Sequence, residues 1–333
     1  MLEEKTIHGI LERYGLDFSE IAQFFDTSRG NDDQRFHYIL DGKYVLKINT
    51  AGLLEERRLQ EISRLIGRYR SIGVYCPRLI PTLQGTYASG LEQEGKQYTC
   101  YVEEYAAFPV CPAGMELDRG EVIAHLGSLA ARYTGVDLCE TRSMWSILDL
   151  APLDIEVDEK QENADLLAET LLDMGLSELA EKADACNRSL REVIRKDYQA
   201  LPRCVYQGDL NASNQLQEDG HFRGLIDFNM SGTEVNINCF VNETNWFPET
   251  EQFDNRTVSE ILEAMDREQN ALLGVILSQY SLNPLEKRLL PYYKRITELF
   301  QYPNVCALIR WLKDDARREK AAALIRALIE KPL

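Results

Sequence analysis

The first third of the chain alternates between segments with the hydrophobic spacing of strands and segments with that of helices. Strand-like runs are rich in β-branched and aromatic residues, and helical runs repeat apolar residues every three or four positions. Asp41-Gly42-Lys43 lies between two apolar runs and indicates a β-hairpin. These patterns predict a short helix over 16–25, strands over 35–41 and 44–49, a charged helix over about 53–72, and strands over 83–88 and 97–104 around a turn at Ser89-Gly90-Leu91-Glu92.

Beyond about residue 109 the pattern becomes mainly helical. Asp118 and Glu121 have the spacing of a capping box at the start of a helix. Further helices are predicted within 161–199, separated at Gly175, and from 256 onward, with breaks near Asn283-Pro284 and Tyr302-Pro303. The chain is therefore predicted to be an α+β protein with two parts, 1–106 and 107–333, joined by a hinge near 104–112.

Composition and charge narrow the classes of function. The chain has 333 residues, of which 44% are hydrophobic and 27% charged, and this is ordinary for a globular protein large enough for two domains. Its 54 acidic and 37 basic side chains give a formal net charge of −17. Such a charge disfavours nucleic acid and anionic membranes as partners and favours a cationic substrate, although acidity that serves solubility alone explains it equally well.

Cysteine spacing and hydropathy place the chain in a reducing, aqueous compartment. The eight cysteines are scattered, without a Cys-x-x-Cys pair or neighbouring histidines. We therefore expect reduced and mostly buried thiols rather than a zinc site or a disulfide framework. No apolar stretch approaches the roughly 18 residues of a membrane span, and the first residues lack the pattern of a signal peptide. The expectation is a cytoplasmic protein, not embedded in a membrane, that is a monomer or homodimer.

The strongest chemical signal lies in two segments, Val205-Tyr206-Gln207-Gly208-Asp209-Leu210-Asn211-Ala212-Ser213-Asn214 and Gly224-Leu225-Ile226-Asp227-Phe228. Asn214 follows Asp209 by five residues, and Asp227 follows it by eighteen, at the end of a predicted strand. Phosphoryl transfer from a nucleotide needs such a set: one carboxylate that orients a hydroxyl nucleophile, and an amide with a second carboxylate that bind magnesium. Asp209 and Asn211 could also merely cap a turn, but the conjunction of spacing and predicted strands favours the chemical interpretation.

This layout resembles the catalytic loop and metal-binding segment of the aminoglycoside phosphotransferase and choline kinase superfamily, whose members are relatives of the protein kinases. The resemblance implies a two-lobed protein-kinase-like fold, with a small N-terminal lobe built on an antiparallel sheet and one main helix, and a larger helical lobe. It also implies transfer of the γ-phosphoryl group of ATP, or in some members GTP, to a hydroxyl of a small molecule, with Mg²⁺ as cofactor. Asp209 is then the catalytic residue, and Asn214 and Asp227 bind the metal.

Two positions depart from the family pattern. Gln207 stands where the family usually has a histidine, whose role is mainly a structural hydrogen bond that a glutamine amide can also make. Phe228-Asn229 follows Asp227 without the glycine of the Asp-Phe-Gly segment of protein kinases. A protein kinase is therefore a less favoured alternative. The alternative outside the enzymes is a catalytically silent nucleotide-binding or regulatory module that kept the fold.

A lysine in the predicted hairpin is a candidate for the nucleotide site. Lys47 lies within the otherwise apolar run 44–48, and the resemblance implies that it contacts the α and β phosphates. In the family this lysine pairs with a glutamate on the following helix, for which Glu61 is favoured and Glu56 is the alternative. A lysine on an edge strand that points to water explains the same sequence without a ligand.

The remaining nucleotide contacts are expected from position. Ser28, Gly30 and Asn31 lie in the turn-rich segment before the hairpin, where the family has its phosphate-binding loop, although a single glycine is present. The hinge, whose backbone would receive the adenine edge, is expected at the end of the strand over 97–104, where strand alternation alone also explains the sequence. Its residues are Glu103, Glu104, Tyr105 and Ala106.

An acid-rich segment follows the metal-binding motif. Residues 243–266 contain seven acidic side chains and one basic side chain, Arg256, with Trp246 and Phe247 among them. Carboxylates and aromatic faces are the groups with which proteins hold ammonium ions, and in the superfamily the acceptor surface comes from helices after the metal-binding aspartate. We therefore expect Glu243 and Trp246 to contact a small, amine-bearing acceptor of the aminoglycoside, choline, ethanolamine or homoserine type. A solvated helix face explains the later acids equally well.

Overall fold

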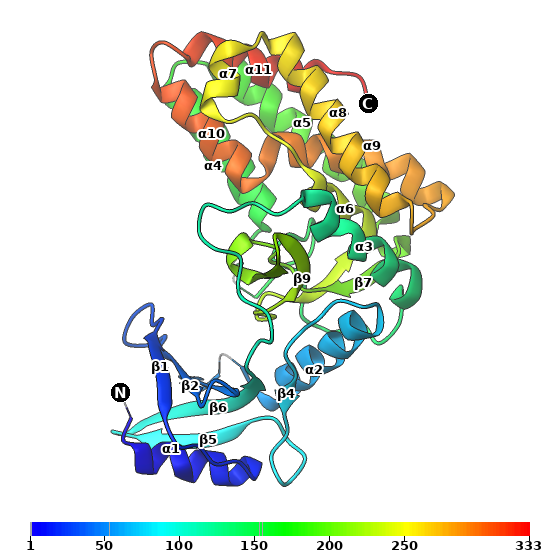
Figure 1. Ribbon diagram of the computed structural model, residues 1–333. Coiled ribbons are helices and arrows are strands. Elements are labelled where there is room, and N and C mark those ends of the chain that lie inside the picture. The colour runs from blue at the N-terminus through cyan, green and yellow to red at the C-terminus, as the bar shows by residue number, and fades with distance from the viewer. Residues whose placement is uncertain (1, 53, 153, 155) are drawn as a thin grey trace. The chain divides into compact units, whose positions relative to one another are not determined.

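The computed structural model describes residues 2–52, 54–152, 154 and 156–333, and they divide into two compact units. Unit 1 contains the residues up to Leu117 together with Asn211–Asn229, and unit 2 contains Asp118–Leu210 and Met230–Leu333 (Figure 1). This division differs from the predicted boundary after residue 106, because unit 1 also takes the segment that carries both predicted metal ligands. Among the described residues, no helix combines the length and the apolar character of a membrane span.

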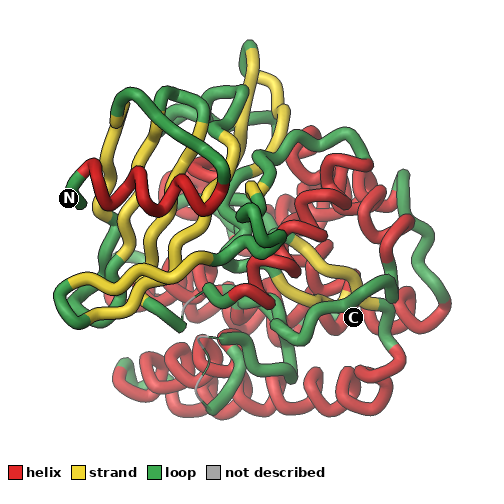
Figure 2. The backbone as a smooth tube through the Cα atoms, turned by 90° about the horizontal axis from the view of Figure 1, so that it is seen from below, coloured by secondary structure: helices red, strands yellow, loops and turns green. Residues whose placement is uncertain are grey.

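Unit 1 is built on an antiparallel sheet. Within its described residues, six strands form this sheet in the order β1-β2-β3-β6-β4, with β5 paired to β6. One face is apolar and packs against α1, which lies across the strands in Figure 2. The elements of this unit are α1 Glu4–Leu11, β1 Ile21–Asp26, β2 Arg35–Leu40, β3 Tyr44–Thr50, α2 Glu56–Ser71, β4 Leu79–Ile80, β5 Ser89–Gln93, β6 Lys96–Glu104, β8 Gln215–Glu218 and β9 His221–Leu225.

The hairpin predicted around Asp41-Gly42-Lys43 is confirmed. β2 and β3 pair in a register that sets His37 opposite Lys47. The backbone angle φ is 51° at Asp41 and 60° at Gly42, which is the left-handed conformation that a tight hairpin turn requires at both central positions. β3 also pairs with β6 and is therefore an inner strand, so Lys47 is not the edge-strand lysine of the alternative interpretation.

The helix predicted over 16–25 is wrong: the second half of this range belongs to the strand β1, and the N-terminal helix is α1, which precedes it. A β-bulge between Ile21 and Gln23 explains the difference. It brings Ile21 and Phe24, three residues apart, to the same face of the sheet, where both pack against the apolar cluster beneath α1. A bulge therefore gives this strand the spacing of a helix.

The turn predicted at Ser89–Glu92 lies within β5, which pairs with β6 through Ser89 opposite Cys100. The chain reverses at Glu94-Gly95, where φ is 52° and 76°. The predicted charged helix is confirmed as α2, over Glu56–Ser71. Leu53, at the start of the predicted range, lies outside the described residues.

A second, two-stranded sheet of unit 1 carries the predicted metal-binding motif. β8 and β9 pair with each other, and β9 lies beside Tyr75, whose N–H donates to Arg223 O at 3.1 Å and whose C=O accepts from Leu225 N at 2.9 Å. A Cβ atom at Gly224 would lie 1.9 Å from the Tyr75 carbonyl oxygen, so only glycine permits this approach. The strand ends at Leu225, which leaves Asp227 just beyond it.

Unit 2 is mostly helical, as the sequence predicts. Gly175 separates α4 from α5 with φ of 74°, and a capping box at Asn283 begins α9. Asp118 caps α3 by accepting from Glu121 N at 2.9 Å. The elements of this unit are α3 Arg119–Tyr133, α4 Glu159–Asp173, α5 Ser177–Asp197, β7 Arg203–Tyr206, β10 Gly232–Val235, α6 Asn236–Thr244, α7 Thr250–Asn255, α8 Val258–Leu277, α9 Pro284–Phe300, α10 Tyr302–Lys313 and α11 Arg318–Glu330.

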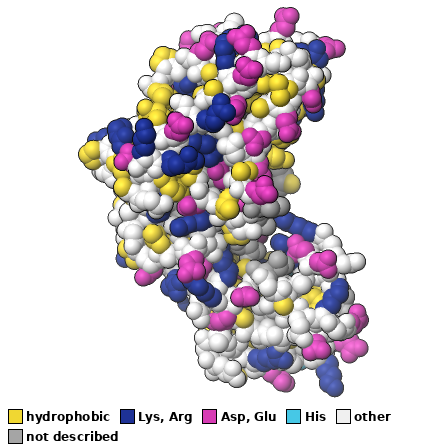
Figure 3. Space-filling model, turned by 180° about the vertical axis from the view of Figure 1, so that it is seen from behind, with side chains coloured by type: hydrophobic (Ala, Val, Ile, Leu, Met, Phe, Trp, Pro, Cys, Tyr) yellow, Lys and Arg dark blue, Asp and Glu magenta, His cyan; other side chains and the backbone are white. Residues whose placement is uncertain are grey.

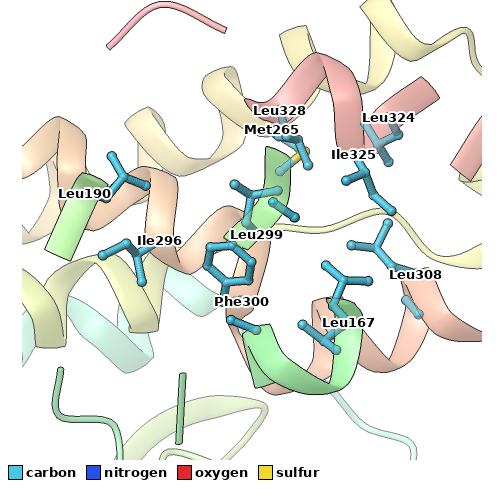
Figure 4. Close-up of a cluster of buried hydrophobic side chains, with 14 of the residues drawn as sticks. Leu167, Leu190, Met265, Ile296, Leu299, Phe300, Leu308, Leu324, Ile325 and Leu328 are labelled. Atoms are coloured by element: carbon cyan, nitrogen blue, oxygen red, sulfur yellow. The ribbon is translucent and has the colours of Figure 1, made fainter. Parts of the chain in front are cut away.

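The helices of unit 2 enclose a large apolar core. Side chains from α4, α5, α8, α9, α10 and α11 meet in the cluster drawn in Figure 4. Full burial of one such side chain contributes about 1.5–3 kcal/mol, so this cluster accounts for much of the stability of the unit. The labelled members are Leu167, Leu190, Met265, Ile296, Leu299, Phe300, Leu308, Leu324, Ile325 and Leu328.

The cysteines are unpaired and mostly buried, as the sequence predicts. The described residues include all eight, each of them a free thiol, and Cys306 on α10 is the only one that is exposed. Burial raises the pKa of Cys76 and of Cys100 to about 12. These two thiols are thus protonated at neutral pH.

Charged side chains of both signs are interspersed on the surface. On the face drawn in Figure 3, both basic and acidic side chains are present across the surface. Ion pairs one helical turn apart occur on α5, where Glu178 pairs with Lys182 at 2.9 Å and Asp184 with Arg188 at 2.8 Å. Exposed pairs of this kind are screened by solvent, so they affect solubility more than stability.

Candidate active site

Asp209 lies just beyond the end of β7 in unit 2. β7 pairs with β10, with Tyr206 opposite Gly232, and the chain then turns at Gly208, whose φ is 82°. A Cβ atom at position 208 would lie 2.5 Å from the carbonyl oxygen of Met230. Glycine is therefore required by the backbone angle and by the close approach together, and this requirement sets the direction in which the chain enters Asp209.

Side chains hold the backbone at and before Asp209. Gln207 is completely buried, and its Oε1 accepts from the N–H of Asp209 at 2.7 Å. Trp145 donates from Nε1 to the carbonyl oxygen of Gly208 at 2.7 Å. Gln207 thus makes a structural hydrogen bond of the kind expected where the family has histidine. The loop that carries Asp209 is fixed from two sides.

Behind Trp145 lies a buried lysine. Lys160 on α4 is completely buried, and its Nζ donates to the carbonyl oxygen of Trp145 at 3.1 Å and lies 3.5 Å from a carboxylate oxygen of Glu159. Asn238 on α6 donates to the same carbonyl at 2.8 Å. A buried ammonium group is costly without partners, so these contacts connect α4 firmly to the loop that carries Asp209.

The predicted metal ligands, Asn214 and Asp227, lie at neighbouring points of unit 1, because the carbonyl of Asn214 accepts from Ile226 N at 2.9 Å. Asp227 is exposed and has φ of 54°, a left-handed angle that is uncommon outside glycine. Its Oδ1 accepts from Asn229 N at 3.3 Å. No group of three His, Cys, Asp or Glu side chains suited to a metal ion occurs among the described residues. Amide and carboxylate oxygens nevertheless suit Mg²⁺, which completes its coordination with water and phosphate oxygens.

Lys47 lines a pocket of unit 1 together with Asp227. Its side chain is 11% exposed, and Nζ lies 2.7 Å from Oε1 of Glu103 and 5.8 Å from the ring centre of Tyr101. Burial lowers the pKa of Lys47, but the nearby acidic groups, Glu103 foremost, outweigh this effect, so the pKa is raised and the ammonium stays charged. The apolar walls of the pocket include Leu59, Ile62, Ile66 and Phe228.

Lys47 thus pairs with Glu103, in place of the predicted Glu61 or Glu56. Sheet register explains the difference: Tyr101 lies opposite Lys47, so Glu103, two residues further along β6, points to the same face. Glu56 instead accepts from the N–H groups of residues 87 and 88, at 2.8 and 2.7 Å.

The carboxylate of Glu61 is occupied by arginines of its own helix, α2. It lies 3.3 Å from Nη1 of Arg58 and 3.9 Å from Nε of Arg57. Arg58 also donates from Nη2 to the carbonyl oxygen of Asn229 at 3.2 Å. Glu61 is therefore linked, through Arg58, to the segment that follows Asp227.

His37 belongs to the same face of the sheet as Lys47, although the sequence did not single it out. It lies directly opposite Lys47 on β2 and is partly buried. Burial and the charge of Lys47 lower its pKa to about 4, against the opposing effect of Asp227, so the imidazole is neutral at physiological pH. Counting residues outward from the Asp41-Gly42 turn would have found this pairing.

The predicted phosphate loop is closed by contacts within unit 1. Ser28 Oγ accepts from Arg35 N at 3.0 Å, and the carbonyl of Asn31 accepts from Lys96 Nζ at 3.2 Å. Gly30 has open space where a Cβ would stand. A role for Ser28, Gly30 and Asn31 in binding phosphate stays a prediction.

The predicted hinge offers fewer backbone donors than expected. The N–H of Tyr105 donates to a carbonyl of the β2–β3 hairpin at 2.8 Å, and that of Glu104 donates to Arg78 O at 2.9 Å. The side chain of Glu103 is turned toward the lysine of β3. Ala106 is the hinge residue whose N–H makes no hydrogen bond within the described residues, so it is the one left for a ligand.

The two predicted acceptor contacts differ in their surroundings within unit 2. Glu243 is partly buried at the end of α6, and its carbonyl accepts from Arg119 Nη2 at 3.0 Å. Burial raises the pKa of its carboxyl to about 7, with Arg119 opposing and Asp209 reinforcing the shift. Trp246 instead packs against the helical core and has the guanidinium of Arg256 5.7 Å from its ring centre. That ring face is therefore not available to an ammonium ligand.

A cavity of about 450 Å³ opens near Glu243 in unit 2. Its volume lies in the range of small-molecule pockets. Arg119 connects it to Glu243, because this side chain lines the cavity and also binds the Glu243 backbone. Three separate segments form the walls, which is why no sequence motif marks the cavity. Lining residues include Arg119, Asn245, Phe247, Glu249, Cys306 and Arg310.

Comparison with known proteins decides the family. The chain matches the model of the phosphotransferase enzyme family (APH) over residues 27–234, more than half of its length. The chain belongs to the phosphotransferase enzyme family. This phosphotransferase is accordingly a kinase of small molecules with a protein-kinase-like fold, as its motif implies. The match includes Lys47, Asp209, Asn214 and Asp227 and ends before Glu243.

Solved structures of kinases resemble the phosphotransferase at low sequence identity. The amicoumacin kinase hAmiN, solved in complex with AMP-PNP, Ca²⁺ and Ami, is 14% identical with a TM-score of 0.51, over 99% of this chain and 94% of that chain. A microcompartment-associated aminopropanol kinase is 13% identical with a TM-score of 0.49, over 98% and 95% of the two chains. At such identity the likeness concerns the fold. Among curated proteins, no sequence matches.

Proposed function

We propose that this phosphotransferase transfers the γ-phosphoryl group of ATP, bound with Mg²⁺, to a hydroxyl group of a small, amine-bearing molecule. The observation that carries the proposal is the support given to the motif residues. Gln207 and Trp145 hold the backbone at Asp209, and the segments of Asn214 and Asp227 are hydrogen-bonded neighbours. A backbone held in this way fixes the positions from which these side chains act. Phosphoryl transfer depends on such positioning more than on covalent chemistry.

Each of these side chains has its own task. Asp209 orients the acceptor hydroxyl and takes its proton as the new O–P bond forms and the bond from the γ-phosphorus to ADP breaks. Lys47 binds non-bridging phosphate oxygens as a charged donor. Asn214 and Asp227 hold Mg²⁺, which when bound neutralises phosphate charge. Ala106 supplies a backbone N–H for the adenine edge.

The acceptor binds near Glu243 and in the cavity beside it. A carboxyl with a pKa raised to about 7 is only partly ionised at neutral pH, and a nearby ammonium group would favour the ionised form. An amine-bearing acceptor would therefore be bound and would lower the pKa of Glu243 at the same time. A cavity of about 450 Å³ accommodates an amino alcohol or one ring of an aminoglycoside.

A turnover screen tests the reaction. ATP or GTP consumption is measured with Mg²⁺ against amino alcohols, aminoglycosides, homoserine and sugars. Asp209→Asn should lower kcat for any active acceptor by about 1,000-fold or more and leave nucleotide binding nearly unchanged, because only the positioning of the hydroxyl and its proton is lost. A variant that no longer binds ATP would show that Asp209 has another role.

A binding test covers the case in which no acceptor is found. Mg²⁺·ATP should raise the thermal stability of the wild-type chain, and Asp227→Asn should remove the Mg²⁺-dependent part of that rise. Asp219→Asn is a matched control, because Asp219 is exposed and has φ of 55°, against 54° for Asp227. No stabilisation of the wild type by ATP or GTP would favour the catalytically silent module.

A further inference from the structure

The ion pair of Lys47 differs from the one that the family pattern predicts. Nζ of Lys47 lies 2.7 Å from Oε1 of Glu103, and the two side chains are 11% and 17% exposed. Lys47 forms no other ion pair within the described residues. A buried charge needs a close partner of opposite sign, so Glu103 is the group that makes a charged Lys47 tolerable at this position.

Both members of this pair stand on paired inner strands of one sheet. β3 and β6 are bonded from Tyr44 opposite Glu104 to Thr50 opposite Tyr98, without a break in register. Glu103 is the diagonal neighbour of Lys47 on the pocket face. The Lys47–Glu103 pair thus joins two strands of one sheet and includes no residue of α2.

The helix glutamate has a different set of partners. Glu61 pairs with Arg58, and Arg58 donates to the carbonyl oxygen of Asn229, beyond the metal-binding aspartate. Within unit 1, Glu103 therefore pairs with Lys47, and Glu61 is linked through Arg58 to the segment that follows Asp227.

We propose that Glu103 is the residue that positions Lys47 for the nucleotide phosphates in this phosphotransferase, in place of a glutamate on α2. The inference rests on the proposed function, because it assumes that Lys47 binds phosphate. Sequence position predicts Glu61 as the partner of Lys47, and the proposal assigns this role to the side chain of Glu103. Glu103 acts through Lys47 and is a positioning residue, not a catalytic one.

The test compares Glu103→Gln with the matched change Glu61→Gln. Binding of Mg²⁺·ATP and of adenosine is measured by calorimetry, and folding is checked by circular dichroism and thermal unfolding. Glu103→Gln should weaken ATP binding by about 10- to 100-fold, the value of a hydrogen bond to a charged group, and change adenosine binding by less than about 2-fold. Glu61→Gln should weaken ATP binding less than Glu103→Gln does, because Glu61 is linked to the proposed metal site only through Arg58 and Asn229.

A double-mutant cycle asks whether Glu103 acts through the lysine. In a Lys47→Met background, Glu103→Gln should cause no further loss of ATP affinity, since the group that it positions is gone. Glu103→Asp keeps the charge at a shorter reach and should retain part of the affinity. It replaces Glu103→Gln in the comparison if that variant does not fold.

Three results would overturn the inference. The first is a Glu103 variant that binds ATP like the wild type, the second is a larger loss from Glu61→Gln, and the third is a loss that persists in the Lys47→Met background. Each leaves the proposed function standing if the wild type binds Mg²⁺·ATP. A wild type that binds neither ATP nor GTP would remove the proposed function and this inference together.

Discussion

Replacing Gly208 by alanine should damage the phosphotransferase through a contact made by a single methyl group. The residue precedes Asp209 and has φ of 82°, and a Cβ placed there would lie 2.5 Å from the Met230 carbonyl oxygen. Cβ atoms essentially never approach another heavy atom within 3.0 Å. The backbone must therefore move by at least the difference, at the position where the chain enters Asp209.

The cost has two parts that can be separated. An alanine held in the left-handed region costs roughly 1–2 kcal/mol. Relief of the clash with Met230 should cost about 1–3 kcal/mol more, as for an extra methyl group in a packed interior. Gly175, also in unit 2, has φ of 74° and nothing within 4 Å of an added Cβ. Gly175→Ala should therefore show the first cost alone.

Urea unfolding followed by tryptophan fluorescence measures both variants in the same unit, because Trp145, Trp246 and Trp311 all belong to unit 2. Gly208→Ala should lose about 2–5 kcal/mol in the free energy of unfolding and lower kcat about 100-fold, since a small displacement of Asp209 impairs alignment. Gly175→Ala should keep wild-type kcat. Equal free-energy losses, within about 0.5 kcal/mol, would refute the claim that the Met230 carbonyl excludes a side chain.

Two further substitutions test the charges of unit 2. Glu243→Gln removes a carboxyl whose pKa in the folded chain is raised to about 7 from 4.5. The protonated carboxyl stabilises the folded chain fully below pH 4.5, and this contribution is lost as the pH rises through 7. The free energy of unfolding of the variant minus that of the wild type should therefore be about 1–3 kcal/mol larger at pH 8 than at pH 5. Urea titrations at both pH values measure this gain, and equal differences would contradict it. Lys160→Met should cost about 2–4 kcal/mol by breaking a buried pair, against less than about 0.5 kcal/mol for the exposed Lys182→Met. A Lys160 variant as stable as the wild type in urea would show that the contacts of Lys160 only offset the cost of burying its charge.

Local signals predicted most elements of the fold. The left-handed positions at Asp41-Gly42 and Gly175 mark breaks that depend only on nearby backbone, and both lie where they were predicted. The strand β1 escaped prediction because a bulge mimics helical spacing, and the β5–β6 turn was misplaced because two glycine-containing segments compete. Pairing with β6, not local preference, selects Glu94-Gly95 as the turn.

The candidate site was predictable where its residues follow one another in the chain. Asp209, Asn214 and Asp227 fall within nineteen positions, so their spacing is enough to predict their roles. Glu103 stands 56 residues after Lys47, and only the register of β3 on β6 joins them. No spacing rule contains that information, and the cavity of unit 2, assembled from three distant segments, escapes sequence reasoning for the same reason.

Because Cys306 is exposed, the native chain can be labelled at a thiol. It is the only exposed thiol among eight, and it lines the 450 Å³ cavity of unit 2. A maleimide dye should therefore attach first at this position without any engineered cysteine, since six of the other thiols are buried and Cys186 is only partly exposed. A dye at that wall would change its emission when a compound enters the cavity. Acceptors could then be found by binding alone, without a nucleotide and without turnover.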